Sequence, residues 1–146
     1  MTARSGLPEG VSVAKLEAPG EERYFSLRRA LGVTSFGCNL IELAPRQRGR
    51  IHEHREQEEV YLVWAGTLTL AFGPDNELAL GRGEAVRVAP EVKRQLLNRG
   101  GESCLVVALG GTGEHAGRDG TAYESWASEE GAPPQEIPLP PDLGTN

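Results

Sequence analysis

The sequence predicts an all-β domain made of many short strands, and two observations carry that prediction. Gly and Pro, the residues that most often mark turns, occur 19 and 10 times in 146 residues. Short runs rich in Val, Leu and Ile lie between these turns at intervals of about 8–12 residues, which is the spacing of strands in sandwiches and barrels. No convincing helical pattern precedes residue 115. The length suits one ordinary domain with its own core.

The strand candidates follow one another from residue 35 to residue 109. Most are rich in apolar or β-branched side chains, and each ends at or shortly before Gly, Pro or a polar turn. They are residues 35–43, 50–54, 59–65, 67–72, 77–80, 85–88, 94–98 and 104–109. Gly66 alone separates the third candidate from the fourth, which indicates a tight hairpin. The last run is nearly all apolar, so we expect a central, buried strand there.

Three regions can be assigned along the chain. Residues 1–22 form an N-terminal leader with one possible strand at residues 11–16, and residues 23–111 form the barrel. The first barrel segment, residues 24–31, mixes apolar and basic side chains and fits either a strand or a short helix.

Residues 112–146 form a C-terminal region of different character. A polar, Gly-rich loop opens it, and a short surface helix is expected at residues 122–130. Five prolines follow between residues 131 and 146, which excludes a helix or a sheet interior. We expect an extended tail, partly polyproline II, that lies on the barrel or is loose in solvent.

Composition excludes several classes of partner. The formal net charge of −6 disfavours nucleic acid and anionic membrane surfaces, and no basic stripe with interleaved aromatics is present. No apolar run is long enough to span a bilayer, and residues 1–10 lack the pattern of a secretory signal, so we expect a cytoplasmic protein. Cys38 and Cys104 lie in apolar strand candidates, which favours buried reduced thiols over a disulfide between them.

Residues with metal-binding chemistry gather in one short window. His52 and His54 are spaced i, i+2, which places both imidazoles on one face of a strand. Glu59 opens the next strand candidate and shares a face with Tyr61. Two imidazoles and a carboxylate form a ligand set that suits Fe, Mn, Ni, Co or Zn. The alternative is a solvated loop, because the surrounding residues are charged.

The spacing of these residues resembles the first signature of the cupin family. His52-Glu53-His54 is followed by four residues, Glu59, six residues and Gly66. The resemblance covers roughly residues 35–110 and implies a cupin jelly-roll β-barrel. It also implies a metal held by three His and one Glu, and three of those four ligands are present.

The second cupin signature is degraded in this chain. Gly83 and Asn98 match its two ends, whereas Pro90 stands one place late. The leading Gly of the first signature is replaced by Arg46. The position that the resemblance assigns to the third metal-binding histidine holds Arg94.

Arg94 leaves two main interpretations open, because a guanidinium is always charged and is a poor metal ligand. In the first, His52, His54 and Glu59 hold a divalent metal, and Arg94 orients an anionic substrate beside it. In the second, Arg94 pairs with Glu59 in place of the metal. A buried carboxylate needs a cationic partner in either case. A third interpretation is an outward-facing arginine. Tyr61 either lines the pocket or packs in the core.

Four other residues are weaker candidates. Arg46, Arg48 and Arg50 alternate before the histidines and would make the pocket mouth basic, but the Pro and Gly around them favour a solvated loop. His115 lies in the Gly-rich loop beyond the barrel and is either a substitute ligand over the mouth or a surface histidine.

These residues and the resemblance predict a small cupin-type protein with a polar barrel pocket, either enzyme or binding module. The resemblance implies a metal-dependent dioxygenase, sugar isomerase or decarboxylase, with Glu59 and Arg94 as the catalytic residues, and fold alone does not choose among them. The alternative is a metal-free module in which Arg94 anchors a small anion. Cupins commonly pair through their sheets, so we expect a homodimer, with Val60, Leu62 and Trp64 buried there or against the second sheet.

Overall fold

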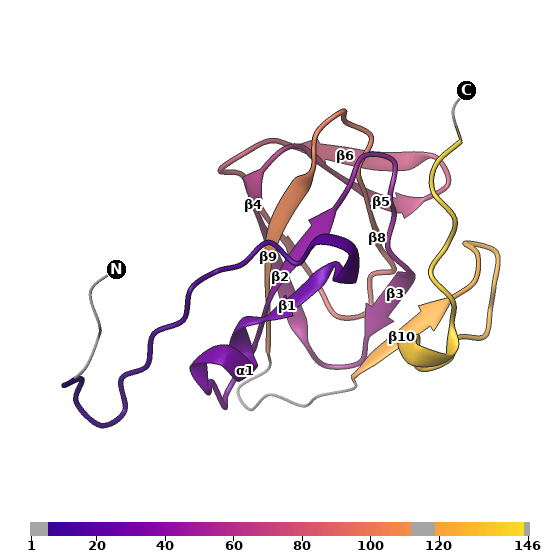
Figure 1. Ribbon diagram of the computed structural model, residues 1–146. Coiled ribbons are helices and arrows are strands. Elements are labelled where there is room, and N and C mark those ends of the chain that lie inside the picture. The colour runs from indigo at the N-terminus through magenta and orange to yellow at the C-terminus, as the bar shows by residue number, and fades with distance from the viewer. Residues whose placement is uncertain (1–5, 112–118, 145–146) are drawn as a thin grey trace.

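Two antiparallel sheets face each other in the computed structural model, which describes residues 6–111 and 119–144 (Figure 1). The first sheet has the order β1-β2-β9-β4-β7, and the second consists of β10-β3 beside β6-β5-β8. Bridges from Arg48 to Leu97 and from His52 to Arg94 join the two parts of the second sheet. The strands are β1 (Tyr24–Ser26), β2 (Gly37–Leu43), β3 (Ile51–His54), β4 (Glu58–Ala65), β5 (Leu68–Gly73), β6 (Asn76–Leu80), β7 (Ala85–Val88), β8 (Gln95–Leu97), β9 (Cys104–Gly111) and β10 (Gly120–Tyr123). The predicted all-β jelly-roll barrel is therefore confirmed.

Alternation along the strands separates the core from the outer faces. On β4, Tyr61 and Val63 are buried, whereas Leu62 and Trp64 are 38% and 45% exposed on the opposite face. Central strand β9 lies between β2 and β4 and buries alternate residues in the same way. The core consists of Ile41, Leu43, Tyr61, Val63, Leu68, Leu70, Leu80, Val88, Leu96, Cys104, Val106 and Ala108.

The hairpin predicted at Gly66 is wrong. β4 pairs with β7 and β9, and β5 pairs with β6 and β8, so the chain crosses from one sheet to the other at this glycine. Gly66 has φ +74, and a Cβ there would meet the carbonyl oxygen of Ser103 at 2.5 Å. The single glycine signals a sharp corner between the two sheets, and only glycine fits it without strain.

The segment before the barrel differs from its prediction in one respect. No strand forms at residues 11–16, which lie beside the barrel without regular structure as the chain approaches β1 (Figure 1). A short 3-10 helix, η1 (Gly20–Glu22), precedes β1. Both alternatives for residues 24–31 occur in succession, because β1 leads into helix α1 (Leu27–Leu31). The Ser26 hydroxyl accepts a hydrogen bond from the Arg29 N–H and caps that helix.

The helix predicted at residues 122–130 is also wrong. Its first residues belong to β10, which pairs with β3, and turns follow up to residue 129. Ala122 and Ala132 then exchange two backbone hydrogen bonds, with N–O distances of 2.8 and 3.0 Å. The open edge of β3 offers unpaired backbone groups, and pairing with that edge outweighs the weak helix propensity of these residues. A 3-10 helix, η2 (Pro134–Glu136), comes next.

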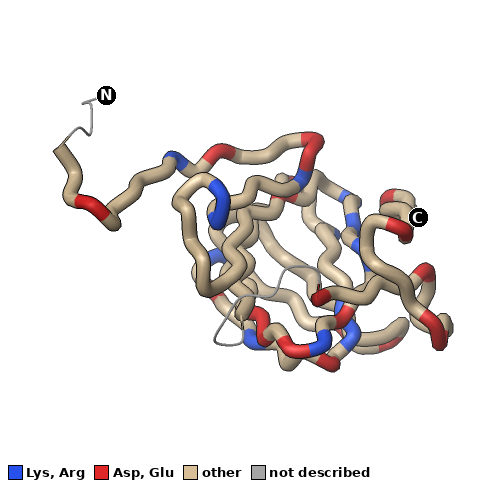
Figure 2. Tube along the Cα trace, turned by 90° about the horizontal axis from the view of Figure 1, so that it is seen from below, with Lys and Arg blue, Asp and Glu red and all other residues tan. Residues whose placement is uncertain are grey.

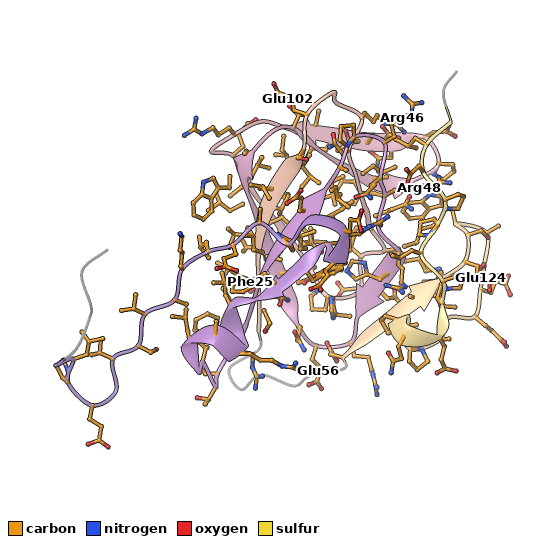
Figure 3. All side chains as sticks on the ribbon, in the orientation of Figure 1. Phe25, Arg46, Arg48, Glu56, Glu102 and Glu124 are labelled. Atoms are coloured by element: carbon orange, nitrogen blue, oxygen red, sulfur yellow. The ribbon has the colours of Figure 1, made fainter. Side chains whose placement is uncertain are left out.

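The proline-rich tail runs beside the segment that leads into β3 (Figure 3). The Nε atoms of Arg46, Arg48 and Arg50 donate hydrogen bonds to the backbone carbonyls of Leu143, Pro141 and Ile137 at 3.1, 2.7 and 2.5 Å. Proline has no N–H but keeps its carbonyl, so a proline-rich segment is a natural acceptor for arginine. The segment is a loop, as expected, and Arg46 is exposed, but all three arginines are also held by the tail rather than by solvent alone.

The cysteines, the surface charges and the helices can be compared with what the composition predicts about disulfides, nucleic acid and membranes. Cys38 and Cys104 are both buried and free. They pair with Leu109 and Leu43 at opposite ends of the β2–β9 ladder, about 17 Å apart along the strands. Basic and acidic residues are interspersed around the barrel (Figure 2). Within the described ranges, no helix has the length and apolar character needed to cross a bilayer.

Candidate metal centre

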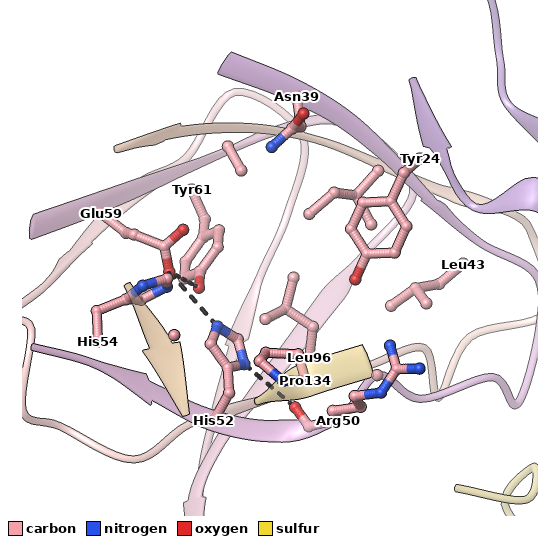
Figure 4. Close-up of a pocket in the computed structure, with 14 residues that line it drawn as sticks. Tyr24, Asn39, Leu43, Arg50, His52, His54, Glu59, Tyr61, Leu96 and Pro134 are labelled. Carbon is pink, nitrogen blue, oxygen red and sulfur yellow. Dashed lines mark hydrogen bonds and ion pairs between the residues drawn. The ribbon is translucent and has the colours of Figure 1, made fainter. Parts of the chain in front are cut away.

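The metal-binding window places its side chains between the two sheets. Ile51 is buried on β3, and the alternation sends His52 and His54 to the opposite face, toward the barrel interior. β4 lies in the other sheet and directs Glu59 and Tyr61 toward the same interior (Figure 4). The histidines of β3 and the glutamate of β4 therefore face each other across the barrel interior, as their spacing in the sequence predicts.

The three predicted ligands converge on one point. The Nε2 atoms of His52 and His54 lie 3.5 and 3.1 Å from Oε1 of Glu59. One ligand atom from each residue lies within 4.8 Å of the other two. Donors bound to one first-row metal at about 2.0–2.2 Å lie about 3 Å apart when adjacent, so this set matches a small coordination sphere.

The second nitrogen of each imidazole faces an acceptor. His52 Nδ1 lies 3.2 Å from the carbonyl oxygen of Arg50, and His54 Nδ1 lies 3.8 Å from Oδ2 of Asp119. These partners favour the tautomer with the proton on Nδ1, which leaves the Nε2 lone pair for a metal. Both ring nitrogens of His54 are buried and make no hydrogen bond within the described residues. A metal at Nε2 would satisfy one of them.

Asp119 is a site residue that sequence reasoning missed. Its Oδ2 accepts hydrogen bonds from the backbone N–H groups of Glu56 and Gln57 at 2.9 and 2.8 Å. Burial alone would raise the pKa of Asp119, but these bonds and the charge of His54 lower that pKa below its usual value. Asp119 therefore stays anionic behind His54.

Arg94 projects into the barrel and is fully buried, with no exposed surface. Its Nη2 donates to Oε1 of Glu59, and its Nε donates to the Tyr61 hydroxyl at 3.2 Å. Its Nη1 lies within hydrogen-bond distance of three backbone carbonyls, those of Ala89, Pro90 and Val92, at 3.3, 3.2 and 2.8 Å. Protein groups therefore occupy all three guanidinium nitrogens, and Arg94 does not line the cavity described below.

Glu59 is the shared acceptor of the whole arrangement. The Tyr61 hydroxyl donates to its Oε1 at 2.6 Å, and Arg94 donates to the same atom. Burial would raise the pKa of Glu59, but the two imidazoles of His52 and His54 beside it outweigh that effect and hold the pKa well below its usual range. Burial raises the pKa of Tyr61, and the charge of Glu59 adds to that shift, so Tyr61 stays protonated as a donor.

A cavity of about 190 Å³ opens beside these residues (Figure 4). His52, His54, Glu59 and Tyr61 form one wall, so Tyr61 both lines the cavity and belongs to the core. The other lining residues are mostly apolar, with three polar exceptions, Tyr24, Asn39 and Arg50. Sequence reasoning considered only Arg50 among these, as part of a basic pocket mouth, and favoured a solvated loop instead. His115, the substitute ligand considered from sequence, lies outside the described residues.

Two positions of the cupin signatures, one that departs from the pattern and one that matches it, have structural explanations. Arg46, which replaces the leading glycine, adopts φ +74, the left-handed conformation that glycine favours. Asn98 matches the second signature and is fully buried. Its Nδ2 donates to the carbonyls of Leu43 and Glu102 at 2.8 and 2.7 Å, which ties β8 to the first sheet.

Comparisons with known proteins agree with this architecture. The family model described as "Cupin domain" matches residues 39–110. A cupin protein from Bacteroides fragilis superposes with a TM-score of 0.62 at 16% identity, over 72% of this chain and 86% of its own. A conserved protein with a double-stranded β-helix domain from Klebsiella pneumoniae gives 0.60 at 16% identity, over 73% and 90%.

A third similar structure has a stated activity. It is a sugar phosphate isomerase of the cupin superfamily from Silicibacter pomeroyi, with a TM-score of 0.59 and 23% identity over 83% of this chain and 82% of its own. No match was found among curated proteins. Such low identities establish the fold and not the reaction. The matched domain, the barrel and the convergent His and Glu residues show that this chain belongs to the cupin superfamily.

Proposed function

We propose that this protein is a metal-dependent cupin enzyme that binds one divalent transition metal through His52, His54 and Glu59. The observation that carries the proposal is the convergence of two Nε2 atoms on the Glu59 carboxylate, with both Nδ1 atoms turned toward acceptors. Two imidazoles and one carboxylate suit Fe, Mn, Ni, Co or Zn and leave coordination positions open. Such a metal, when bound, polarises an oxygen of the substrate.

The chain's own residues divide the remaining tasks. Arg94 and Tyr61 hold Oε1 of Glu59, so they fix the carboxylate rather than contact substrate. Asp119 and the Arg50 carbonyl fix the two imidazoles. The cavity beside this wall would hold a small molecule. The reaction types suggested by the resemblance, dioxygenase, isomerase and decarboxylase, would all use a substrate bound at such open positions.

Elemental analysis tests the proposal. Tag-free protein is dialysed with transition metals, freed of excess and measured by plasma mass spectrometry. We expect about one metal per chain for the wild type and for Glu58→Gln, whose carboxylate pairs with Arg87 at the surface. Glu59→Gln and His52→Ala should each lose most of the metal while keeping the circular dichroism spectrum of a folded β protein. Metal-free wild type after reloading would overturn the proposal.

One observation favours a second candidate function, a metal-free binding module. Arg94 already supplies a cation to Glu59, so the buried carboxylate has a partner without any metal. The site would then recognise a small polar molecule and catalyse nothing. The same experiment separates the two, because this candidate predicts no bound metal together with thermal stabilisation by a small molecule. In that case Arg94 would act through Glu59 and Tyr61, since it does not line the cavity.

A further inference from the structure

We propose that Arg50 and Tyr24 form an anion-binding subsite at the end of the cavity away from the His and Glu residues. The ligand would then carry a carboxylate or phosphate at one end and metal-binding oxygens at the other. This inference deepens the proposed function and rests on it for the metal-bound end only. It names a class of substrate, which the proposed metal ligands His52, His54 and Glu59 (the triad) do not do by themselves.

Arg50 is positioned to face the cavity with an uncommitted charge. It is the one arginine or lysine among the described residues that line the cavity. Its Nε is fixed by the carbonyl of Ile137, which holds the side chain in place. Its Nη1 and Nη2 atoms make no hydrogen bond or ion pair within residues 6–111 and 119–144. A planar guanidinium with two outward N–H groups suits bidentate binding of a carboxylate or phosphate.

Tyr24 supplies a second donor to the same place. Tyr24 as a whole is 49% exposed, and its hydroxyl points into the cavity (Figure 4). That hydroxyl has no hydrogen-bond partner in the described part of the chain. Burial raises the pKa of Tyr24, and the charge of Arg50 acts against that rise, which places the two groups within electrostatic reach. The hydroxyl therefore remains a proton donor.

The distance to the triad suits one small molecule. Arg50 precedes His52 by two residues, which places their Cα atoms about 6–7 Å apart in extended chain. The cavity between them is walled by the apolar side chains of Ile41, Leu43, Leu96 and Ala108. A short carbon skeleton would cross that apolar stretch and present its polar groups at both ends.

The charge balance also favours an anion at Arg50. Glu59 is the one carboxylate among the described lining residues, and Arg94 neutralises it from outside the cavity. Arg50 therefore remains as an uncompensated cation at the wall. A partly buried cation without a partner is costly, and an anionic ligand would relieve that cost.

Arg48 provides a matched control, since its Nε also donates to a tail carbonyl, that of Pro141, but it does not line the cavity. Arg50→Met and Arg48→Met should thus weaken the tail contact equally. Calorimetry of metal-loaded protein uses three probes, which are malate, 3-phosphoglycerate and acetohydroxamate. Acetohydroxamate reports the metal alone, because it has no second anionic group.

We expect Arg50→Met to weaken the binding of malate, 3-phosphoglycerate or both at least tenfold. Tyr24→Phe should weaken the binding of the same probe severalfold, and Arg48→Met should change the affinity for neither probe. The probe that binds more tightly to wild type identifies the anion as carboxylate or phosphate. Acetohydroxamate should bind wild type and Arg50→Met alike. Equal affinity of both anionic probes for wild type and Arg50→Met would overturn the subsite. If acetohydroxamate fails to bind wild type, the metal proposal fails instead. The subsite can then still be tested by titrating malate and phosphate into metal-free wild type and metal-free Arg50→Met. We expect binding to be lost only in Arg50→Met.

Discussion

Arg94 and Glu59 form a buried ion pair that spans the two sheets of the barrel. Arg94 precedes β8 in the second sheet, and its backbone exchanges two hydrogen bonds with His52, each with an N–O distance of 2.9 Å. Glu59 lies on β4 in the first sheet. Arg94 thus supports the Glu59 carboxylate through its side chain and positions His52 through its backbone. Loss of this cation leaves a buried charge uncompensated, which is strongly destabilising.

In metal-free protein, replacement of Arg94 by Met should lower the free energy of unfolding by about 3–5 kcal/mol, because Glu59 then lacks any cationic partner. The matched control is Arg87→Met, which removes the partner of Glu58 on the same strand. That pair is exposed at the surface, so we expect a loss below about 1 kcal/mol. Urea denaturation measures both, and equal effects of the two substitutions would contradict the role given to Arg94.

Replacement of Asp119 by Asn should weaken metal binding about 10–100-fold, the usual effect of losing the partner of a ligating imidazole. The comparison variant is Glu53→Gln on the outer face of β3, where Glu53 accepts a hydrogen bond from Tyr123. Competition with a chromogenic chelator gives both affinities. An unchanged affinity in Asp119→Asn would show that Asp119 does not orient His54.

Arg46 holds a left-handed conformation that costs a side chain about 1–2 kcal/mol relative to glycine. Arg46→Gly should therefore be more stable than Arg46→Ala by about 1 kcal/mol. Both variants lose the same hydrogen bond to the Leu143 carbonyl, so that contact cancels from the comparison. Paired thermal melts test the order, and an Ala variant as stable as the Gly variant would refute the strain argument.

The exposed apolar face of β4 should be a contact between two copies of this chain. The sequence predicts that Leu62 and Trp64 are buried either in a homodimer or against the second sheet. The second sheet does not cover them, so burial in a homodimer is the alternative that remains. Trp64→Lys should convert a dimer to a monomer at micromolar concentration in a sedimentation experiment. Leu78→Lys, at a 40% exposed position on β6, should leave the mass unchanged. A monomeric wild type would contradict this assembly.

The thiols should be inert in the folded protein. Burial raises the pKa of Cys104 from 9.0 to about 11, so roughly one thiol in a thousand is ionised at pH 8. Burial also raises the pKa of Cys38. Labelling by a disulfide reagent at pH 8 should be slow in buffer, faster as the pH approaches 11, and rapid for both thiols in urea. Rapid labelling of either thiol in buffer would show that the barrel opens readily.

Local pattern was sufficient to predict an all-β domain of short strands and a shared face for the two histidines, and the resemblance to the cupin signature added the jelly-roll barrel and strengthened the grouping with Glu59. His52 and His54 share a face because alternation along a strand is a geometric property, and Glu59 lies one short turn away. The same reasoning failed at Gly66, where one glycine between two apolar runs fits a hairpin and a sheet-to-sheet corner equally well. Only the pairing of β5 with β6 and β8 decides between them.

The supporting residues depend on contacts between distant parts of the chain. Asp119 reaches His54 from 65 positions later in the sequence, and nothing around either residue signals that contact. Arg50 was expected to be solvated, because the tail carbonyl that fixes it is 87 positions away. Residues 122–130 carry helix-compatible side chains, but the open edge of β3 was not visible from their sequence.

The most direct measurement of the central claim is anomalous X-ray diffraction at the absorption edge of the metal, from crystals of protein loaded with that metal. The account predicts one peak within about 2.0–2.3 Å of the Nε2 atoms of His52 and His54 and of the Glu59 carboxylate, with Arg94 hydrogen-bonded to Glu59 and outside the coordination shell. A fully loaded soak with no peak between these residues, or with the metal elsewhere on the chain, would contradict it.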